Sequence, residues 1–214
     1  MPFTKGAVAH VDEYKAGLFF SYDFVGESSW NGYERNCLFA NVGGGHFVDV
    51  ARPTGADSVR DGRGVAVADF NGDGKLDVAI NNNNARPTIY MNAFVTSGNW
   101  LRLDLVGSVS NRDAVGARVR LTLAGGEGGK TLTRWVEAGS GYASQSAFPV
   151  HFGLGRAAVE TVEIVWPSGR VDHLDGGELG INRTVRIEEH PAGVEGARRT
   201  ARRDPVSPAS LTEG

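Results

Sequence analysis

Short segments rich in β-branched and aromatic residues recur along most of this chain, and glycine-rich turns separate them. Two such segments, Leu101–Val106 and Ala117–Leu123, alternate apolar and polar residues as half-buried strands do. The turns include Gly43–Gly45, Gly125–Gly129 and Pro167–Gly169. Glycine tolerates positive φ and proline fixes φ, so these residues favour tight turns. Because no long segment shows a helical period, the sequence predicts a mainly β fold.

Composition and charge exclude several classes of protein. The chain has 214 residues and a formal net charge of −3, and 30 of its residues are glycine without a Gly-X-Y period. A collagen helix is therefore excluded, and general nucleic-acid binding is disfavoured because such proteins are usually basic. The longest apolar run, Ala16–Phe20, falls far short of the roughly 18 residues that a membrane span needs. We expect neither a nucleic-acid nor a membrane partner.

The single cysteine and the N-terminus add two further constraints. Cys37 has no partner for an internal disulfide or a CxxC site, and its strand-like surroundings predict a buried position. The residues before Asp12 contain no apolar core of a signal peptide. The sequence as given therefore shows no export signal.

The character of the sequence changes at residues 96–99. Residues 36–95 are rich in Asn, Asp and Gly, whereas residues 100–190 form a more regular series of strands and turns. We expect two β domains, preceded by a weakly defined segment, 1–35. Residues 191–214 lack a pattern of large apolar residues, so we expect a disordered tail that cannot offset its ordering entropy by burial.

The clearest chemical motif is the segment Asp69–Asp77, with the sequence DFNGDGKLD. Oxygen-bearing side chains occupy positions 1, 3, 5 and 9 of this segment, and position 6 is glycine. Calcium takes about six to eight oxygen ligands, and alternate residues of a tight loop can direct oxygens to one centre. The expected ligands are the side chains of Asp69, Asn71, Asp73 and Asp77 and the backbone carbonyl of Lys75.

This motif differs from an EF-hand. Position 12 is Ile80, where an EF-hand has a bidentate Glu, and the flanks Val65–Ala68 and Val78–Ile80 resemble strands rather than helices. The sequence therefore predicts a strand–calcium loop–strand unit of modest affinity. The alternative is an Asx-rich turn without an ion, which the strict alternation of oxygen ligands disfavours.

Residues 64–80 resemble an FG-GAP/VCBS repeat, the blade unit of integrin-α-like β-propellers. Residues 36–50 resemble the strand pair that ends a preceding blade, and residues 88–92 repeat the first part of that pair. The resemblance implies the same five calcium ligands. A propeller needs about four blades to close, so either the chain is the C-terminal part of a longer protein or a partner covers the open sheet edges.

The second region carries motifs that resemble an ASPIC/UnbV domain over about residues 100–189. They are Ser110–Val119, Gly139–Ser146, His151–Gly155, Val165–Arg170 and Asn182–Thr184. The resemblance implies that the partial β-propeller is followed by an antiparallel β-sandwich or barrel-like domain. It places the chain in the cartilage acidic protein/UnbV-like family, whose animal members are matrix proteins and whose bacterial members are associated with enediyne biosynthesis.

The second region also holds the ingredients of a hydrolase. These are Ser140, Ser144, Ser146, His151 and Asp113. No G-x-S-x-G elbow is present, since Gly139-Ser140-Gly141 has the wrong frame, and the five histidines show no pair at metal-ligand spacing. A catalytic triad is therefore disfavoured, and whether the chain catalyses any reaction stays open.

Two functional hypotheses follow from the motifs and the resemblance. The first is a calcium-stabilised, non-catalytic module for binding or matrix interaction, extracellular or periplasmic in its full-length form. Its partners would be an unknown protein or carbohydrate, together with further propeller blades or a partner chain on the open edges. The second is an accessory or catalytic component of a bacterial enediyne-type biosynthetic pathway.

Overall fold

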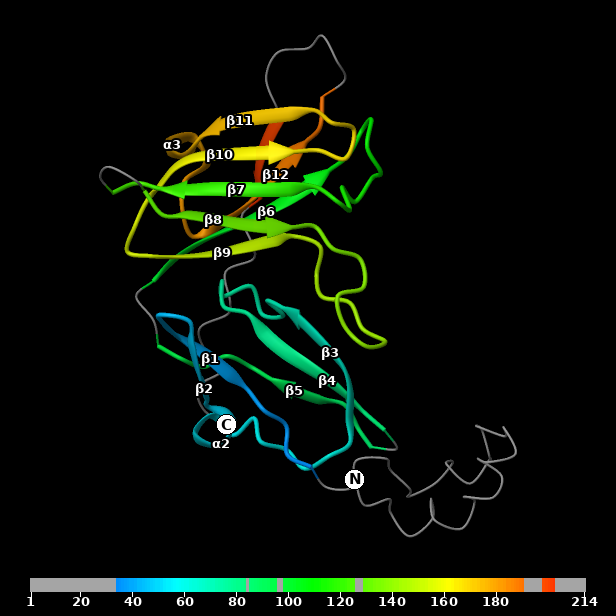
Figure 1. Ribbon diagram of the computed structural model, residues 1–214. Helices are drawn as coiled ribbons and strands as arrows, with labels where there is room; N and C mark the ends of the chain where they lie inside the picture. The colour runs from blue at the N-terminus through cyan, green and yellow to red at the C-terminus, as the bar shows by residue number, and fades with distance from the viewer. Residues whose placement is uncertain (1–33, 84, 96–97, 126–128, 191–197, 203–214) are drawn as a thin grey trace, which may run out of the picture. The chain divides into compact units, whose positions relative to one another are not determined.

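The computed structural model describes residues 34–83, 85–95, 98–125, 129–190 and 198–202, and they are mainly β as predicted (Figure 1). They contain two four-residue helices, α2 (Ala51–Thr54) and α3 (Gly176–Leu179). The chain divides into two compact units. The described part of the first comprises residues 34–66, 78–90 and 141–144, and that of the second comprises residues 67–77, 91–140 and those from 145 onward.

The first unit has the sheets expected of propeller-like blades. Strands β1 (Phe39–Gly43) and β2 (His46–Asp49) form an antiparallel hairpin. Strands β3 (Gly62–Ala68), β4 (Asp77–Asn82) and β5 (Thr88–Tyr90) form a sheet in that order, with β4 and β5 antiparallel. The end of β3 and the start of β4 flank loop 69–77, so the predicted strand–loop–strand arrangement is confirmed.

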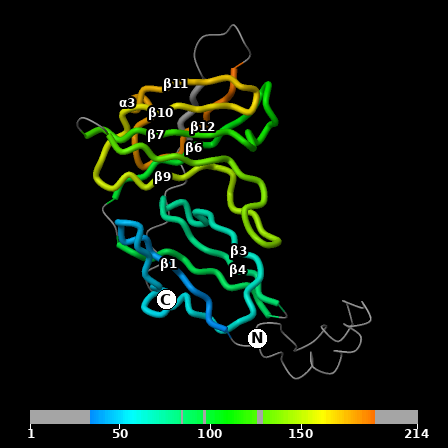
Figure 2. Tube along the Cα trace, in the orientation of Figure 1, coloured from blue at the N-terminus to red at the C-terminus, as the bar shows by residue number. Residues whose placement is uncertain are grey.

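The second unit contains two four-stranded sheets, ordered β11-β10-β7-β8 and β13-β12-β6-β9. Their strands are β6 (Asn99–Val106), β7 (Arg118–Leu123), β8 (Thr131–Trp135), β9 (Val150–Gly155), β10 (Val159–Val165), β11 (Val171–Asp175), β12 (Arg183–Glu188) and β13 (Arg198–Arg202). Figure 2 shows β7 running beside β10, its hydrogen-bonded neighbour.

A single apolar core lies in this second unit. Along β6 the side chains alternate, and Leu101, Leu103 and Leu105 are buried. They belong to one cluster with buried residues of both sheets, including Phe152 of β9 and Ile164 of β10. Alternating strands that bury one face against another sheet form a sandwich. The predicted sandwich is therefore confirmed.

One strand pair departs from the antiparallel prediction. Strands β6 and β12 run parallel, with Leu101 opposite Arg183 and Val106 opposite Glu188. A parallel pair requires a long connection between its strands. Here β7 to β11 lie between them in the sequence. The first strand of the sandwich, β6, is therefore hydrogen-bonded to β12, a strand near its C-terminal end.

Part of the expected disordered tail is a strand. Arg198–Arg202 form β13, which pairs antiparallel with β12. Backbone hydrogen bonding satisfies an otherwise open strand edge without requiring apolar side chains, so composition does not reveal it. The prediction of disorder is wrong for these five residues. The rest of the predicted tail, 191–197 and 203–214, and residues 1–33 of the N-terminal segment lie outside the described residues.

Two further expectations differ from the structure. The predicted division at residues 96–99 does not separate the units cleanly, because loop 67–77 belongs to the second unit although its sequence belongs to the repeat. Cys37 is exposed and precedes β1, so the prediction of a buried strand residue is wrong. Its apolar neighbours Leu38 and Phe39 are exposed as well, at 41% and 61%.

Candidate functional site

Asp69 organises the first half of loop 69–77. Its Oδ1 accepts hydrogen bonds from the backbone N–H groups of Gly72 at 2.8 Å and Asp73 at 3.1 Å, and its Oδ2 accepts one from Gly74 at 2.9 Å. Gly72 and Gly74 adopt positive φ angles of 75° and 83°. Glycine reaches this region without strain, so the backbone can curl around the buried carboxylate.

Asp77 and Asp73 hold the rest of the loop. Asp77 is 1% exposed, and its carboxylate accepts hydrogen bonds from the N–H groups of Phe70 at 2.9 Å and Asn92 at 2.7 Å. The carboxylate of Asp73 accepts from the Lys75 N–H at 2.9 Å and lies 3.1 Å from Lys75 Nζ. Burial raises the pKa of Asp73, but these contacts with Lys75 and a hydrogen bond from Asn71 outweigh it and lower the pKa.

The donor set of the loop matches calcium chemistry. All five residues predicted as ligands lie in this one loop, and they offer three carboxylates, an amide oxygen and a carbonyl oxygen. In the structure the carboxylates of Asp69, Asp73 and Asp77 accept hydrogen bonds from backbone N–H groups. No group of three or more His, Cys, Asp and Glu side chains is placed to hold a metal ion within the described part of the chain. A bound ion would have to compete with these N–H groups and with Arg102 for the carboxylates.

The loop is docked on strand β6 by two contacts. Arg102 Nη1 lies 3.1 Å from Asp69 Oδ2, whose side chain is 0% exposed, and Arg102 Nε donates to Thr184 Oγ1 at 2.8 Å. Gly74 lies so close to Trp100 that a Cβ there would be 2.0 Å from the indole Nε1. These contacts explain why the loop belongs to the second unit.

Arg102 and Trp100 were not singled out from the sequence. Arg102 is separated from Asp69 by 33 positions, and no local spacing signals their ion pair. The only available signal is a charged residue within the apolar alternation of Leu101–Leu105.

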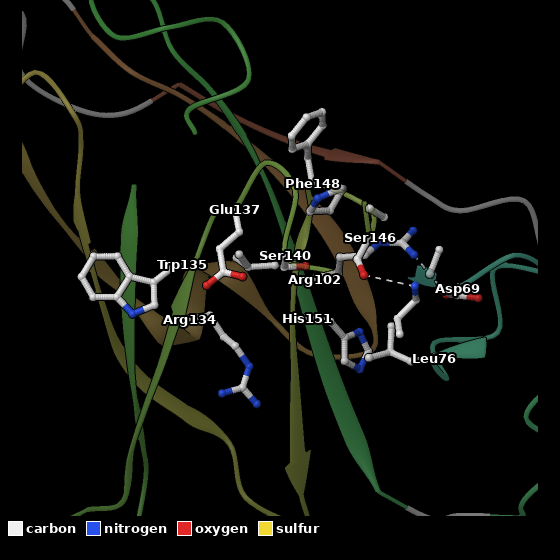
Figure 3. A pocket seen from close by; sticks show the side chains of 15 residues that line it. Asp69, Leu76, Arg102, Arg134, Trp135, Glu137, Ser140, Ser146, Phe148 and His151 are labelled. Atoms are coloured by element: carbon white, nitrogen blue, oxygen red, sulfur yellow. Dashed lines mark hydrogen bonds and ion pairs between the residues drawn. The ribbon is translucent and has the colours of Figure 1, made fainter. Parts of the chain in front are cut away.

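A pocket of about 240 Å³ opens beside the loop (Figure 3). Asp69 and Leu76 of the loop line it together with Arg102, Arg134, Glu137 and His151. In Figure 3, Arg134 and Glu137 lie on one side of the view, and His151, Leu76 and Asp69 lie on the other. The pocket therefore joins the repeat-derived loop to side chains of the sandwich.

His151 is a partly buried titratable group in the pocket. Its ring stacks on Trp100 with centroids 5.9 Å apart and an interplanar angle of 17°. Its Nδ1 is buried and has no hydrogen-bond partner among the described residues. Burial, followed by the charges of Arg102 and Arg134, lowers the pKa of His151 against the opposing effect of Asp69. The lowered pKa favours the neutral imidazole, which has one donor and one acceptor.

The structure brings together part of the disfavoured triad. Ser140, Ser146 and His151 line the same pocket, but Ser146 Oγ accepts a hydrogen bond from the Val67 N–H at 3.1 Å. No hydrogen bond joins His151 to a serine in the described residues. Asp113 is exposed and does not line the pocket, and Ser144 belongs to the first unit. The contacts that activate a serine nucleophile are not formed here.

Glu189 is a buried carboxylate that the sequence did not reveal. It is 2% exposed and accepts from the N–H groups of Ser108, Val109 and Ser110 at 3.0, 3.0 and 2.7 Å. The hydroxyls of Ser110 and Ser168 also donate to it. Burial raises its pKa, but these hydrogen bonds, led by that of Ser168, outweigh burial and lower the pKa to about 2. Glu189 thus joins the turn at Ser108–Ser110 to the turn at Ser168, and Ser110 and Ser168 both belong to the motifs named above for the second region.

Comparison with known proteins identifies both regions. The family described as "FG-GAP-like repeat" matches residues 24–80, and "ASPIC and UnbV" matches residues 107–194. Cartilage acidic protein 1 of Xenopus tropicalis is 33% identical over 146 residues, 66% of this chain and 22% of that protein. The mouse protein of the same name is 34% identical over 140 residues, 63% of this chain and 19% of that protein. The matches thus span about a fifth of these relatives.

None of the helices in the described ranges is long and apolar enough to cross a membrane.

Proposed function

We propose that this chain, which belongs to the family that joins FG-GAP-like repeats to an ASPIC and UnbV domain, is a calcium-stabilised binding module of an extracellular matrix. The relatives support the matrix setting, because proteins named cartilage acidic protein 1 are 33% and 34% identical to it. They are animal proteins, which favours this role over a bacterial biosynthetic one.

The observation that carries the proposal is the docking of loop 69–77 beside an open pocket. The Asp69–Arg102 ion pair and the Gly74–Trp100 contact fix the loop on the sandwich. The pocket next to it presents charged and polar side chains, and among the described residues no hydrogen bond joins its serines to His151. A concave pocket with an apolar lining and a few placed polar side chains suits recognition of a ligand.

Calcium is the proposed cofactor of the loop. The side chains of Asp69, Asn71, Asp73 and Asp77 and the Lys75 carbonyl would hold the ion. Three carboxylates in nine residues repel one another unless a cation balances them, and Arg102 and Lys75 now supply that charge. Without a bidentate Glu, a dissociation constant of about 10⁻⁴–10⁻³ M is expected, as in extracellular calcium modules.

A neighbouring protein surface is the proposed partner of the first unit. In the hairpin β1–β2, Phe39 and Phe47 are each 61% exposed and Val42 is 62% exposed. An isolated two-stranded hairpin is marginally stable in water, and exposed apolar faces of this kind usually meet another surface. Further propeller repeats or a partner chain would cover these side chains.

Retention on a matrix surface tests the proposed function. The full chain, passed over immobilised cartilage matrix extract in about 5 mM calcium, should be retained several-fold better than in chelator. Asp73→Ala should lose this difference because it removes a ligand. Asp113→Ala, which changes an exposed aspartate outside the loop, should keep it. Equal retention in calcium and chelator, or none in either, would contradict the proposal.

A further inference from the structure

We propose that the pocket beside loop 69–77 and the groove that continues from it bind a neutral oligosaccharide, with one sugar ring in the pocket. This inference rests on the proposed binding function and names its ligand class. It is carried by the shape of the groove, by the balance of its charges and by the polar and aromatic side chains that line it.

The shape fits a chain of rings. The pocket of about 240 Å³ is smaller than the roughly 300–1,000 Å³ that sites for drug-sized ligands occupy. A second hollow of about 940 Å³ shares Leu76, Arg134 and His151 with it and extends to Trp100 and Asn182. The two hollows adjoin at these shared residues, and taken together as a groove they suit a ligand that places one unit in the pocket and extends along the surface.

The charges along the groove cancel. Arg102 pairs with Asp69 and Lys75 pairs with Asp73, both at 3.1 Å. The remaining charged side chains that line the two hollows, Arg134 and Glu137, have opposite signs. A groove without net charge gives little attraction to a phosphate or sulfate group. Its chemistry favours an uncharged ligand rich in hydrogen-bonding groups.

The polar groups suit hydroxyl groups in particular. His151 lines both hollows; its Nδ1 is buried, and its other ring nitrogen, Nε2, can exchange a hydrogen bond with a hydroxyl. Arg134 is held over the Phe152 ring at 5.8 Å and donates to the Thr133 carbonyl at 2.9 Å, which positions its planar group. A planar guanidinium, with Glu137 nearby in the lining, can address adjacent hydroxyls of one ring.

Aromatic side chains complete the lining. Trp135 lines the pocket and is 53% exposed. Trp100, which lines the larger hollow, is already stacked on His151 and has the Arg102 guanidinium 5.9 Å from its ring centroid. The large apolar area of the exposed Trp135 ring favours contact with the C–H face of a sugar ring. The groove thus offers hydrogen bonds at ring edges and apolar contact at ring faces, the two requirements of sugar recognition.

Saturation-transfer NMR with defined oligosaccharides tests this inference. The probes are chitotriose, cellotetraose and lacto-N-tetraose as neutral sugars, and hyaluronan and heparin tetrasaccharides as acidic ones. We expect at least one neutral sugar to bind the full chain with a dissociation constant of about 1 mM or lower. Arg134→Ala and Glu137→Gln should each weaken that binding about tenfold, as loss of a charged hydrogen bond does.

Controls separate this inference from the proposed function. Arg112→Ala changes an exposed arginine outside the groove and should bind the sugar as the wild type does. Each variant should melt near the wild-type temperature. Binding of acidic sugars alone, binding unaffected by Arg134→Ala, or no sugar binding up to about 10 mM would overturn the inference. Binding of matrix peptides together with no binding of any neutral sugar would assign the groove to a peptide instead. Calcium-dependent matrix retention would still hold in each case.

Discussion

The first and second units differ in where their large apolar side chains lie. In the second unit a single buried cluster extends from Leu101 to Ile187 and draws on both sheets. In the first, Ala51 and Ile80 are the only buried apolar residues among those described, whereas Phe39 and Phe47 are mostly exposed. Similar strand-forming sequences therefore serve two purposes, a closed core in one unit and an uncovered surface in the other.

This difference has an energetic consequence. Burial of apolar surface contributes about 25 cal/mol per Å², and it is the main term that offsets conformational entropy. The second unit gains this stabilisation from burial within its own core. The hairpin β1–β2, whose β2 residues are all exposed, gains little of it. Strand patterns alone do not distinguish these cases, because the alternation of residues is the same whether the apolar face meets its own chain or a neighbour.

Matched truncations of two phenylalanines should give the largest contrast. Phe152 is 0% exposed and Phe47 is 61% exposed. Phe152→Ala should lower the free energy of unfolding by about 3–5 kcal/mol because it leaves a cavity. Phe47→Ala should change it by about 0.5 kcal/mol or less, as for other surface substitutions. Urea unfolding measures both. Similar losses for the two variants would show that the hairpin already has a core.

Loss of the Glu189 carboxylate should have the next largest effect. Glu189→Gln should destabilise the second unit by about 2–4 kcal/mol, because a carboxylate bound by several donors is replaced by a group that donates on one side. The pKa of Glu189 is lowered from 4.5 to about 2. Its stabilising contribution is therefore complete above pH 4.5 and is lost as the pH falls from 4.5 toward 2.

The pH profile provides the control for Glu189. Wild-type unfolding free energy should fall across this acid range more steeply than that of Glu189→Gln. Glu160→Gln, at an exposed position of β10, should keep the wild-type profile. Parallel profiles for wild type and Glu189→Gln would show that the hydrogen bonds of the Glu189 carboxylate do not stabilise the second unit.

Glycine substitutions test why the loop belongs to the second unit. Gly74 and Gly169 have similar φ angles of 83° and 87°, but only Gly74 has a side chain against its Cβ position. Both alanine variants should lose about 1–2 kcal/mol from backbone strain. Gly74→Ala should lose a further 1–3 kcal/mol, roughly, through the clash with Trp100. Equal losses measured by urea unfolding would mean that the loop is not held on Trp100.

Local patterns in the sequence predicted most of this structure. Alternation located β6 and β7, strand-like flanks placed strands on either side of the loop, and the spacing of Asp69, Asn71, Asp73 and Asp77 located the loop itself. The mainly β class, the blade-like first unit and the sandwich are confirmed. These features depend on residues that are close in sequence, where periodicity and turn chemistry carry the information.

Contacts between distant residues were not predictable in the same way. Arg102 meets Asp69, Trp100 meets Gly74, and Glu189 meets Ser110 only because the fold brings them together. Strand β13 was missed for a related reason, since backbone pairing does not depend on apolar side chains. Cys37 is exposed beside a hairpin whose large apolar side chains are themselves exposed, and no local pattern in the sequence signals this.

Calcium binding at loop 69–77 is tested most directly by thermal unfolding of the full chain in chelator and in about 5 mM calcium. A ligand that binds only the folded state stabilises it, here by about 1 kcal/mol for a dissociation constant near 10⁻³ M. The melting temperature of the wild type should therefore rise by roughly 2–4 °C in calcium. Asp73→Ala should show no such rise, and Asp113→Ala should show the wild-type rise. Coincident melting curves of the folded wild type in chelator and calcium would contradict calcium binding by this loop.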